Sequence, residues 1–464
     1  MVVALVVLLV GQAVALGLSV APATGGRGTR VGLAALAAGV ALWAVSLRVL
    51  SRGLSRGLGR RAATWAVLGG QLVLLGIAVA APPAGSDDVY RYVWDGRVQA
   101  AGIDPYRYAP LDPALAGLRD PVLFPGGRAC STDHPAGAGY LEPDCTLINR
   151  PEVATIYPPV AEASFWLVSR FGGLSRSGGV SAIGGGRGGV LAFQIAGALA
   201  AAGVGLLVLR RAGPARAAVW CWCPPVLTGA VNDAHVDGLA VLLTVGGLLA
   251  AGSSRPFRAG GLVGAAVAVK ITPAVVLPAL VRSRWVRVGL AVVAVVALSY
   301  LPHVLALGPR VLGYLPGYLS EEGYDGGNRF LLLADVLGPQ HARAAAVALL
   351  AVLAAATAWR SDPRAPERSA LLLAGGSLFV ATPAYPWYGL LVIALGALAG
   401  RPRWVAVSLA PALAYSAVDL PGVTDAGLAG WAVAAAFVVA PGVVRVARSA
   451  RRARAGPTGP GRSG

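Results

Sequence analysis

The sequence predicts an all-helical protein that crosses a membrane many times. Only 13% of its 464 residues are charged, whereas soluble domains average about 25%. The mean hydropathy is +0.67, and the apolar residues gather in long continuous runs. The first run, 2–21, carries no charge over a length that spans a bilayer core as a helix. Because lipid cannot satisfy free backbone groups and the runs do not alternate, we expect helices throughout.

Similar runs recur to the C-terminal end, and we expect about 12 of them to be true spans. Some shorter runs are candidates for re-entrant half-helices. We expect the first run to be retained, because no small-residue cleavage site and soluble body follow it. The runs lie at 2–21, 31–47, 62–81, 153–171, 190–209, 216–230, 236–250, 260–281, 286–307, 344–359, 369–381, 388–400, 405–417 and 426–444.

The distribution of arginine predicts the orientation in the membrane. A net charge of +18 would suggest nucleic-acid binding in a soluble protein, but here the basic residues cluster in short loops and in the tail 445–454. The segment 48–61 holds five arginines and no acid, so we expect it to be cytoplasmic. Counting onward places 82–152 outside. We therefore expect a lipid bilayer, and no nucleic acid, as a partner.

The middle of the chain allows two topologies. If every run crosses once, two basic loops fall on the outside. We favour an interpretation in which the run 260–281 bends at Pro273 and returns, which requires that one element between 153 and 209 does not span. Four parts are expected: N-terminal helices (1–81), an outer loop (82–152), helices with short outer loops (153–444) and a basic, disordered cytoplasmic tail (445–464).

The segment 82–152 is the longest polar stretch, and a loop of this length is usually functional or disordered. Its aromatic residues favour a small ordered cap, and 88–101 has helix-compatible spacing and is expected along the membrane surface. If the loop faces an oxidising compartment, a disulfide between Cys130 and Cys145 would restrain it. Cys221 and Cys223 are expected to be packing residues inside a span.

Asp87 and Asp88 stand just beyond the third run. Adjacent carboxylates repel each other, yet a catalyst can use one as a general base and the other to orient a hydroxyl, a cation or an arginine. Arg91 and Asp95 follow at helical spacing and can share a face with them. The alternative is a pair of solvated acids that cap a helix.

Lys270 is the only lysine of the chain and lies inside the run 260–281. A charge there requires a partner or an aqueous cavity. Pro273 suggests a broken helix close by, and a phosphate group would suit the ammonium. The alternative is snorkelling to the membrane interface.

Asp233, His235 and Asp237 alternate within 232–238, between two apolar runs. Such a set can bind a sugar, a phosphate or a metal, or can simply cap a helix. The chain has just four histidines and no second cluster, so no metal site is assigned.

Tyr157 and Trp387 each open an apolar run. Either residue can stack on a sugar, or can serve only as an interfacial anchor. Arg329 lies in an outer loop, where it can pair with a phosphate or with a loop acid.

Taken together, these stretches resemble the polyprenyl-phosphate-mannose-dependent mannosyltransferases of the GT-C glycosyltransferase superfamily, especially the actinobacterial ones. They occur in the family's order and cover most of the chain from about 80 to 400. The matching stretches are SDDVYRYVWDGR (86–97), AGIDPY (101–106), IYPP (156–159), NDAHVDG (232–238), VKITP (269–273) and PWY (386–388).

The resemblance implies a GT-C-like helical bundle whose first long extracytoplasmic loop carries the catalytic acid. That acid is Asp88 or Asp87. Asp88 is favoured because it precedes an Arg-Tyr pair by three residues, as in related lipid-linked sugar transferases. The acid would deprotonate an acceptor hydroxyl, which attacks the anomeric carbon with inversion. The departing polyprenyl phosphate would be met by cationic side chains, and the expected ones are Lys270, Arg91 and Arg329.

The expected partners are a polyprenyl-phosphate-mannose donor and a glycan or glycolipid acceptor at a bacterial cytoplasmic membrane. Residues expected to bind the sugar or the acceptor are Asp95, Tyr157, His235, Asp237 and Trp387. No cofactor is assigned as required, since members of the family differ over a divalent metal. The alternatives are a transferase of another sugar, such as arabinose, and a transporter or flippase of a lipid-linked substrate. A transporter is disfavoured because no paired repeat is visible.

Overall fold

A computed structural model describes residues 2–21, 25–125, 145–171, 187–417 and 427–440. Every secondary-structure element in these ranges is helical. Within them, six helices are long and apolar enough to cross a membrane, and a bent pair adds a seventh candidate. This agrees with a polytopic membrane protein. The expected number of about 12 spans is not confirmed, because several apolar runs form shorter or interrupted helices.

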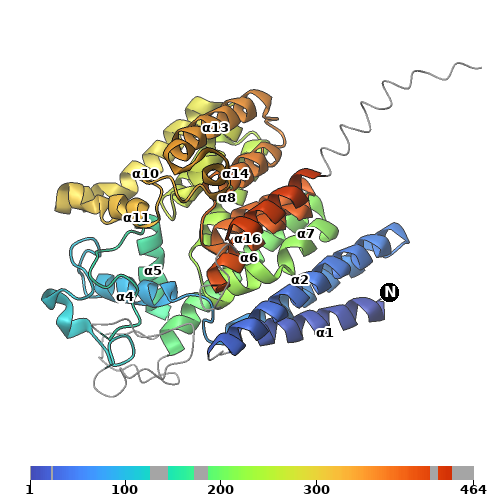
Figure 1. The fold of residues 1–464 in the computed structure, drawn as a ribbon, viewed down its shortest axis with the longest axis horizontal. Helices are drawn as coiled ribbons and strands as arrows, with labels where there is room; N and C mark the ends of the chain where they lie inside the picture. Colours follow the sequence, from blue (N-terminus) through green and yellow to red (C-terminus); the bar gives the residue numbers. More distant parts are fainter. Residues whose placement is uncertain (1, 22–24, 126–144, 172–186, 418–426, 441–464) are drawn as a thin grey trace, which may run out of the picture.

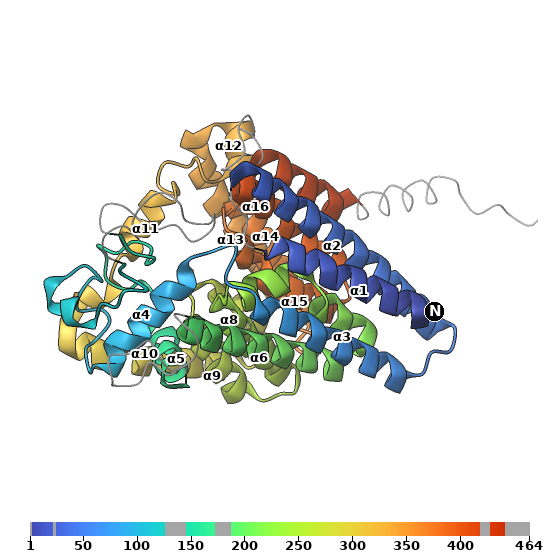
Figure 2. The same cartoon turned by 90° about the horizontal axis from the view of Figure 1, so that it is seen from below.

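The N-terminal helices pack along one side of the molecule (Figures 1 and 2). They are α1 (Val2–Ser19), α2 (Gly25–Ser55) and α3 (Arg60–Ala80). Gln12 in α1 donates a hydrogen bond of 2.8 Å to the hydroxyl of Ser46 in α2, and both side chains are buried. Hydrogen bonds between polar side chains commonly hold apolar helices together in membranes. Lipid competes with the van der Waals packing between helices but not with these hydrogen bonds.

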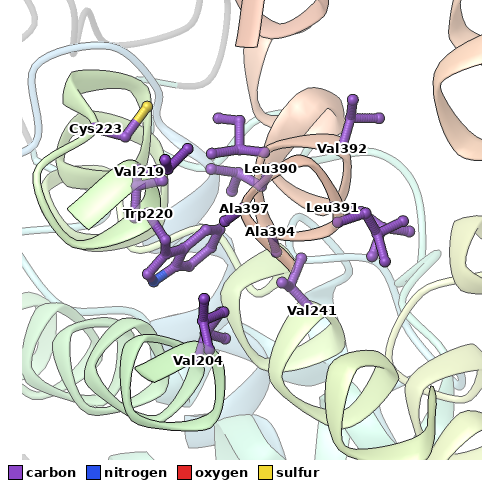
Figure 3. Packing of buried hydrophobic residues seen from close by; sticks show 14 of the residues in the cluster. Val204, Val219, Trp220, Cys223, Val241, Leu390, Leu391, Val392, Ala394 and Ala397 are labelled. Carbon is purple, nitrogen blue, oxygen red and sulfur yellow. The ribbon is translucent and has the colours of Figure 1, made fainter. Parts of the chain in front are cut away.

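The short helix α15 (Leu390–Ala399) forms the centre of the bundle. Every residue from Leu390 to Leu398 is buried, as expected of a helix that is apolar on all sides. Figure 3 shows its side chains against Val204 of α6 (Arg187–Ala212), Trp220 of α7 (Pro214–Cys221) and Val241 of α8 (Asp237–Gly252). As expected, Cys221 and Cys223 are buried and unbridged. The central helix fixes the residues that precede it, including Trp387.

Two helical segments are interrupted where the sequence becomes polar. The π-helix η3 (Val226–Asn232) and α8 meet at an angle of 110°. Helix α9 (Pro256–Val267) ends before η4 (Thr272–Leu280), so the interruption expected near Pro273 lies just ahead of that proline. Residues 233–236 and 268–271 thus form two breaks, which contain Asp233, His235 and Lys270. Within a membrane, irregular backbone is tolerated only where protein buries it or where it lines a cavity.

The segment after α3 folds as a cap, and its buried apolar residues share one hydrophobic cluster, the cap cluster, with α5 (Pro159–Phe171), α6, the start of α8 and the two breaks. Helix α4 (Asp88–Ala100) forms as expected; its place along the membrane surface stays a prediction, and its side chains are buried on most sides. The reason is close packing on α5. A Cβ on Gly96 would stand 2.7 Å from the carbonyl oxygen of Phe165, so only glycine allows this approach. At 1.5 Å per residue, α5 is about 20 Å long, too short to cross a core of about 30 Å.

The cap lies at one end of the molecule together with α11 (Leu315–Glu321), and the arginine-rich turn between α2 and α3 lies at the other (Figures 1 and 2). The tail 445–464 and Cys130 lie outside the described residues. The remaining elements are η1 (Pro113–Leu118), α10 (Trp285–Leu307), η5 (Gly308–Leu312), α12 (Leu331–Leu337), α13 (Pro339–Arg360), α14 (Glu367–Ala381), η6 (Pro386–Gly389), η7 (Pro402–Val405), α16 (Ala406–Ala417) and an apolar helix at Gly427–Ala440.

Candidate active site

The two adjacent aspartates share one donor. The side-chain amide nitrogen of Asn149 donates to Oδ1 of Asp87 at 3.0 Å and to Oδ1 of Asp88 at 2.7 Å. Asp88 is the first residue of α4, and its backbone N–H donates to the Ser86 hydroxyl at 3.2 Å. The pair is therefore a built arrangement and not two solvated loop acids. Asn149 was missed from the sequence because it lies 61 residues beyond Asp88, without a motif around it.

The surroundings move the two carboxyl groups in opposite directions. Burial and the charge of Asp88 raise the pKa of Asp87, and Asn149 and Arg150 oppose this only in part. Burial would also raise the pKa of Asp88, but His235, Lys270 and Asn149 outweigh burial and lower it. Asp88 is consequently the acid of the pair that stays ionised to lower pH, and a general base must start in the ionised form.

His235 stands behind Asp88. Its Nδ1 lies 3.3 Å from Oδ2 of Asp88, and its side chain is fully buried. The imidazole stacks on Trp387, with ring centroids 3.8 Å apart and planes at 21°. The structure thus brings together two residues assigned to sugar or acceptor binding and places both beside the candidate base.

The break at 233–236 also holds the turn that carries the aspartates. Asn232 accepts a hydrogen bond from the backbone N–H of Ala84 at 3.0 Å, and its amide donates to carbonyls at the end of α3. Oδ1 of Asp233 accepts from the N–H of Gly85 at 2.8 Å. A Cβ on Gly85 would stand 2.8 Å from Oδ2 of Asp233. These hydrogen bonds attach residues 84–85, just before Asp87, to the break between η3 and α8.

Lys270 occupies the second break. Its ammonium donates to Oδ2 of Asp237 at 2.7 Å and lies 4.4 Å from the ring centroid of Tyr388. The hydroxyl of Tyr388 is 2.6 Å from that of Tyr318 in α11. Lys270 is close enough to Asp88 for its charge to lower the pKa of that acid. His235 contacts Asp88 and Asp237 contacts Lys270, so residues 235–237 connect the lysine with the aspartate pair.

A cavity of about 240 Å³ is lined in part by residues that contact Lys270, although Lys270 itself does not line it. Asp237 and Tyr388, the two contacts of Lys270, form part of its wall, as does Tyr324. The rest is mainly apolar and comes from α8, η4, α14 and α15, including Val241, Pro273, Val275, Ala374, Leu378, Leu391 and Val392. A charged group beside an apolar cavity between helices is suited to an amphiphile with an anionic head.

Arg91 and Asp95 form a buried ion pair away from the aspartate pair. Nε of Arg91 donates to both oxygens of Asp95, at 3.0 and 3.1 Å. Its other nitrogens donate to the carbonyls of Arg150 and Val153. The guanidinium is thus occupied, and the geometry does not favour the phosphate-binding role expected from the sequence. Glu162 is buried beside this pair, and burial raises its pKa well above the usual range.

The other expected residues lie nearby in different settings. Tyr157 packs edge-on against Tyr92 at 5.1 Å between centroids, inside the cap cluster. Nη2 of Arg329 lies 3.5 Å from Glu322, while its buried Nε and Nη2 have no hydrogen bond within the described ranges. Arg329 therefore keeps donor capacity but is paired with an acid of the outer loop.

Arg150 is a further residue that the motifs did not reveal. Its guanidinium donates to both carboxylate oxygens of Glu321 at the end of α11, with the shortest contact 2.6 Å. Its backbone φ is +46°, a left-handed conformation that is uncommon outside glycine. This contact joins the segment that carries Asn149 to α11.

Among the described residues, no three His, Cys, Asp or Glu side chains gather as a metal site. Cys145 takes part in a disulfide. Its expected partner, Cys130, lies outside the described residues, so the pairing stays a prediction.

Residues 156–383, just under half of the chain, match the model of glycosyltransferase family 87. No curated protein and no solved structure gave a match. The matched region contains both helix breaks and Lys270, and it begins after the aspartate pair. It favours a transferase over a transporter. The match supports a membrane glycosyltransferase of the GT-C-like kind, with a sugar donor, an acceptor and a lipid bilayer as its partners.

Proposed function

We propose that this glycosyltransferase transfers mannose from polyprenyl-phosphate-mannose to a glycan or glycolipid on the extracytoplasmic side of a bacterial cytoplasmic membrane. The observation that carries the proposal is the connection between the candidate base and the candidate phosphate-binding lysine. His235 contacts Asp88, and Asp237, two residues later, binds Lys270. The proposed proton acceptor, Asp88, and the proposed phosphate-binding cation, Lys270, are thus connected through His235 and Asp237.

In the proposed reaction, Asp88 accepts the proton of an acceptor hydroxyl as that oxygen attacks the anomeric carbon. The new C–O bond forms while the bond from that carbon to the phosphate oxygen breaks, and the polyprenyl phosphate leaves with the electron pair. Lys270 stabilises the charge that develops on this phosphate. A single displacement inverts the anomeric centre, so a β-linked donor gives an α-mannoside.

The apolar cavity supports a lipid-linked donor over a sugar nucleotide. Its aliphatic wall offers contact to an isoprenoid chain, and Asp237 and Tyr388, which line it, are the residues that Lys270 contacts. Burial of methylene and methyl groups there contributes about 25 cal/mol per Å² of apolar surface. A nucleotide would instead require polar partners for its base and a second phosphate.

The choice of mannose rests on the ordered stretches that resemble mannosyltransferases. Trp387 stacked on His235 provides a flat apolar surface of the kind that suits a sugar ring, but it does not discriminate among sugars. Arabinose is the principal competing donor sugar.

The test is transfer by the purified protein in detergent or liposomes. Radiolabelled polyprenyl-phosphate-mannose is supplied with an oligomannoside acceptor, and polyprenyl-phosphate-arabinose is supplied in parallel. We expect mannose transfer that Asp88→Asn abolishes and that Asp87→Asn reduces. Transfer that survives Asp88→Asn would remove Asp88 as the base, and transfer of arabinose alone would replace the proposed sugar.

A further inference from the structure

We infer that Asn149 is a positioning residue for the transfer reaction, whose side-chain amide holds Asp87 and Asp88 together and fixes the carboxylate of Asp88 for proton acceptance. This inference rests on the proposed function for the role of Asp88. It concerns a residue outside the motifs and outside the part of the chain that matches the family model.

The geometry fits the donor capacity of a carboxamide. An asparagine amide nitrogen carries two hydrogens, and here it contacts one oxygen of each carboxylate, at 3.0 and 2.7 Å. The carbonyl oxygen of the same amide could not take this place, because it would face two acids without a hydrogen. One neutral side chain therefore holds two groups that would otherwise repel each other.

The backbone around Asn149 is fixed on both sides, so this contact is not incidental. Before it, Ile148 is fully buried, and its N–H donates to the hydroxyl of Thr146 at 3.1 Å. After it, the Arg150 side chain binds Glu321, and the Arg150 carbonyl accepts from Arg91. The ion pair of Arg91 with Asp95 thus acts on the site indirectly, by holding the segment that presents the amide.

The charges around the pair show what the amide changes. Asn149 lowers the pKa of both aspartates, since it donates to their ionised forms. The other titratable or charged groups that face Asp88 or Asp87 are His235, Lys270, Asp233, Arg150, Tyr92, Tyr157 and Tyr415. None of these bridges both carboxylates. Removing the amide therefore leaves Asp88 facing Asp87 with no shared donor.

The sign of the effect follows from this. Asp88 must be ionised to accept a proton, and the loss of Asn149 raises its pKa. The acidic limb of the pH–rate profile should consequently move to higher pH in Asn149→Ala, by about one pH unit for the loss of a hydrogen bond to a charged group. At pH values well above the limb, kcat should recover toward the wild-type value.

The experiment compares kcat and KM for mannose transfer across pH in the wild type, Asn149→Ala, Asn149→Gln and Asn328→Ala. Asn328 is an exposed asparagine of an outer loop and serves as the matched control. We expect the limb to shift in Asn149→Ala, to return part of the way in Asn149→Gln, which restores a donor, and to stay unchanged in Asn328→Ala. A uniform loss of kcat with an unmoved limb would overturn the inference, and so would a wild-type profile in Asn149→Ala.

A second measurement separates this inference from the proposed function. Infrared titration follows the carboxylic-acid band of Asp87 and Asp88 as the pH is lowered, with each band assigned from Asp87→Asn and Asp88→Asn. It needs no sugar transfer. If wild-type protein transfers nothing, the proposed reaction fails. The carboxylic-acid band of Asp88 should still appear at higher pH in Asn149→Ala than in the wild type. A band that titrates identically in both proteins would refute the positioning role.

Discussion

Replacing Lys270 with methionine should destabilise the protein and disable transfer for two separable reasons. The ammonium lies 2.7 Å from the carboxylate of Asp237, and the two side chains are 18% and 7% exposed. Two unit charges at that separation attract by about 6 kcal/mol at an effective dielectric constant of about 20. Desolvation offsets part of this, so stranding Asp237 should cost about 3–5 kcal/mol of folding free energy.

The double variant Lys270→Met/Asp237→Asn separates stability from catalysis. It leaves no stranded charge, so its unfolding midpoint in detergent should return toward that of the wild type. Transfer should stay about a hundred- to a thousand-fold below wild type, the usual cost of removing one group that stabilises developing charge. The matched control is Arg258→Met, since Arg258 is an exposed cation whose removal leaves no buried acid without its partner. It should change stability by no more than about 0.5 kcal/mol.

Two results would refute this reasoning. If the double variant transfers mannose at the wild-type rate, Lys270 does not meet the leaving phosphate. If Lys270→Met unfolds at the same midpoint as the wild type, the contact with Asp237 does not contribute the expected stability. Thermal unfolding and single-turnover transfer on the same preparations distinguish these two outcomes.

Three other outcomes follow from the site and its supports. The surroundings lower the pKa of Asp88 and raise that of Asp87. The stabilisation from ionised Asp88 should therefore persist down to about pH 4 and be lost as the pH falls further. Infrared titration should show that Asp87 protonates before Asp88. Gly96→Leu should lower the unfolding midpoint by forcing α4 away from α5, while Gly117→Ala, which meets no atom within 4 Å, should not. Asp233→Ala should release the N–H of Gly85 and reduce kcat more than stability, measured by transfer and by thermal unfolding.

Local pattern was enough to predict the helical class and α4. Periodic apolar residues and the absence of charge specify a membrane helix by themselves, since the lipid acts on each segment independently. The interruption near Pro273 was also foreseen, because a proline cannot donate its nitrogen to the preceding turn. The number of about 12 spans stays a prediction, since apolar composition does not distinguish a crossing helix from a short buried one such as α15.

The contacts of the site depend on partners that are distant in sequence. Asn149 reaches residues 61 and 62 positions before it, and Arg150 reaches across 171 positions to Glu321. No periodicity encodes such distances. Arg91 illustrates the converse, since its helical spacing from Asp88 suggested a shared role, whereas its i,i+4 spacing to Asp95 produced a buried ion pair. Spacing identifies which residues can meet, and burial decides which of them pair.

Hydrogen bonds at the two helix breaks attach the cap to the helical bundle. At the first break, Asp233 binds the N–H of Gly85, just before the aspartate pair. At the second, the carbonyl oxygen of Ala268 accepts hydrogen bonds from the N–H groups of Val160 and Ala161 in the first turn of α5, at 2.9 and 3.3 Å. The end of one helix thus satisfies the start of another, which removes unpaired groups that apolar surroundings would penalise. Each break therefore presents a charged side chain and also fastens one end of the cap, so Asp88 and Lys270 are positioned by the same two interruptions of the bundle.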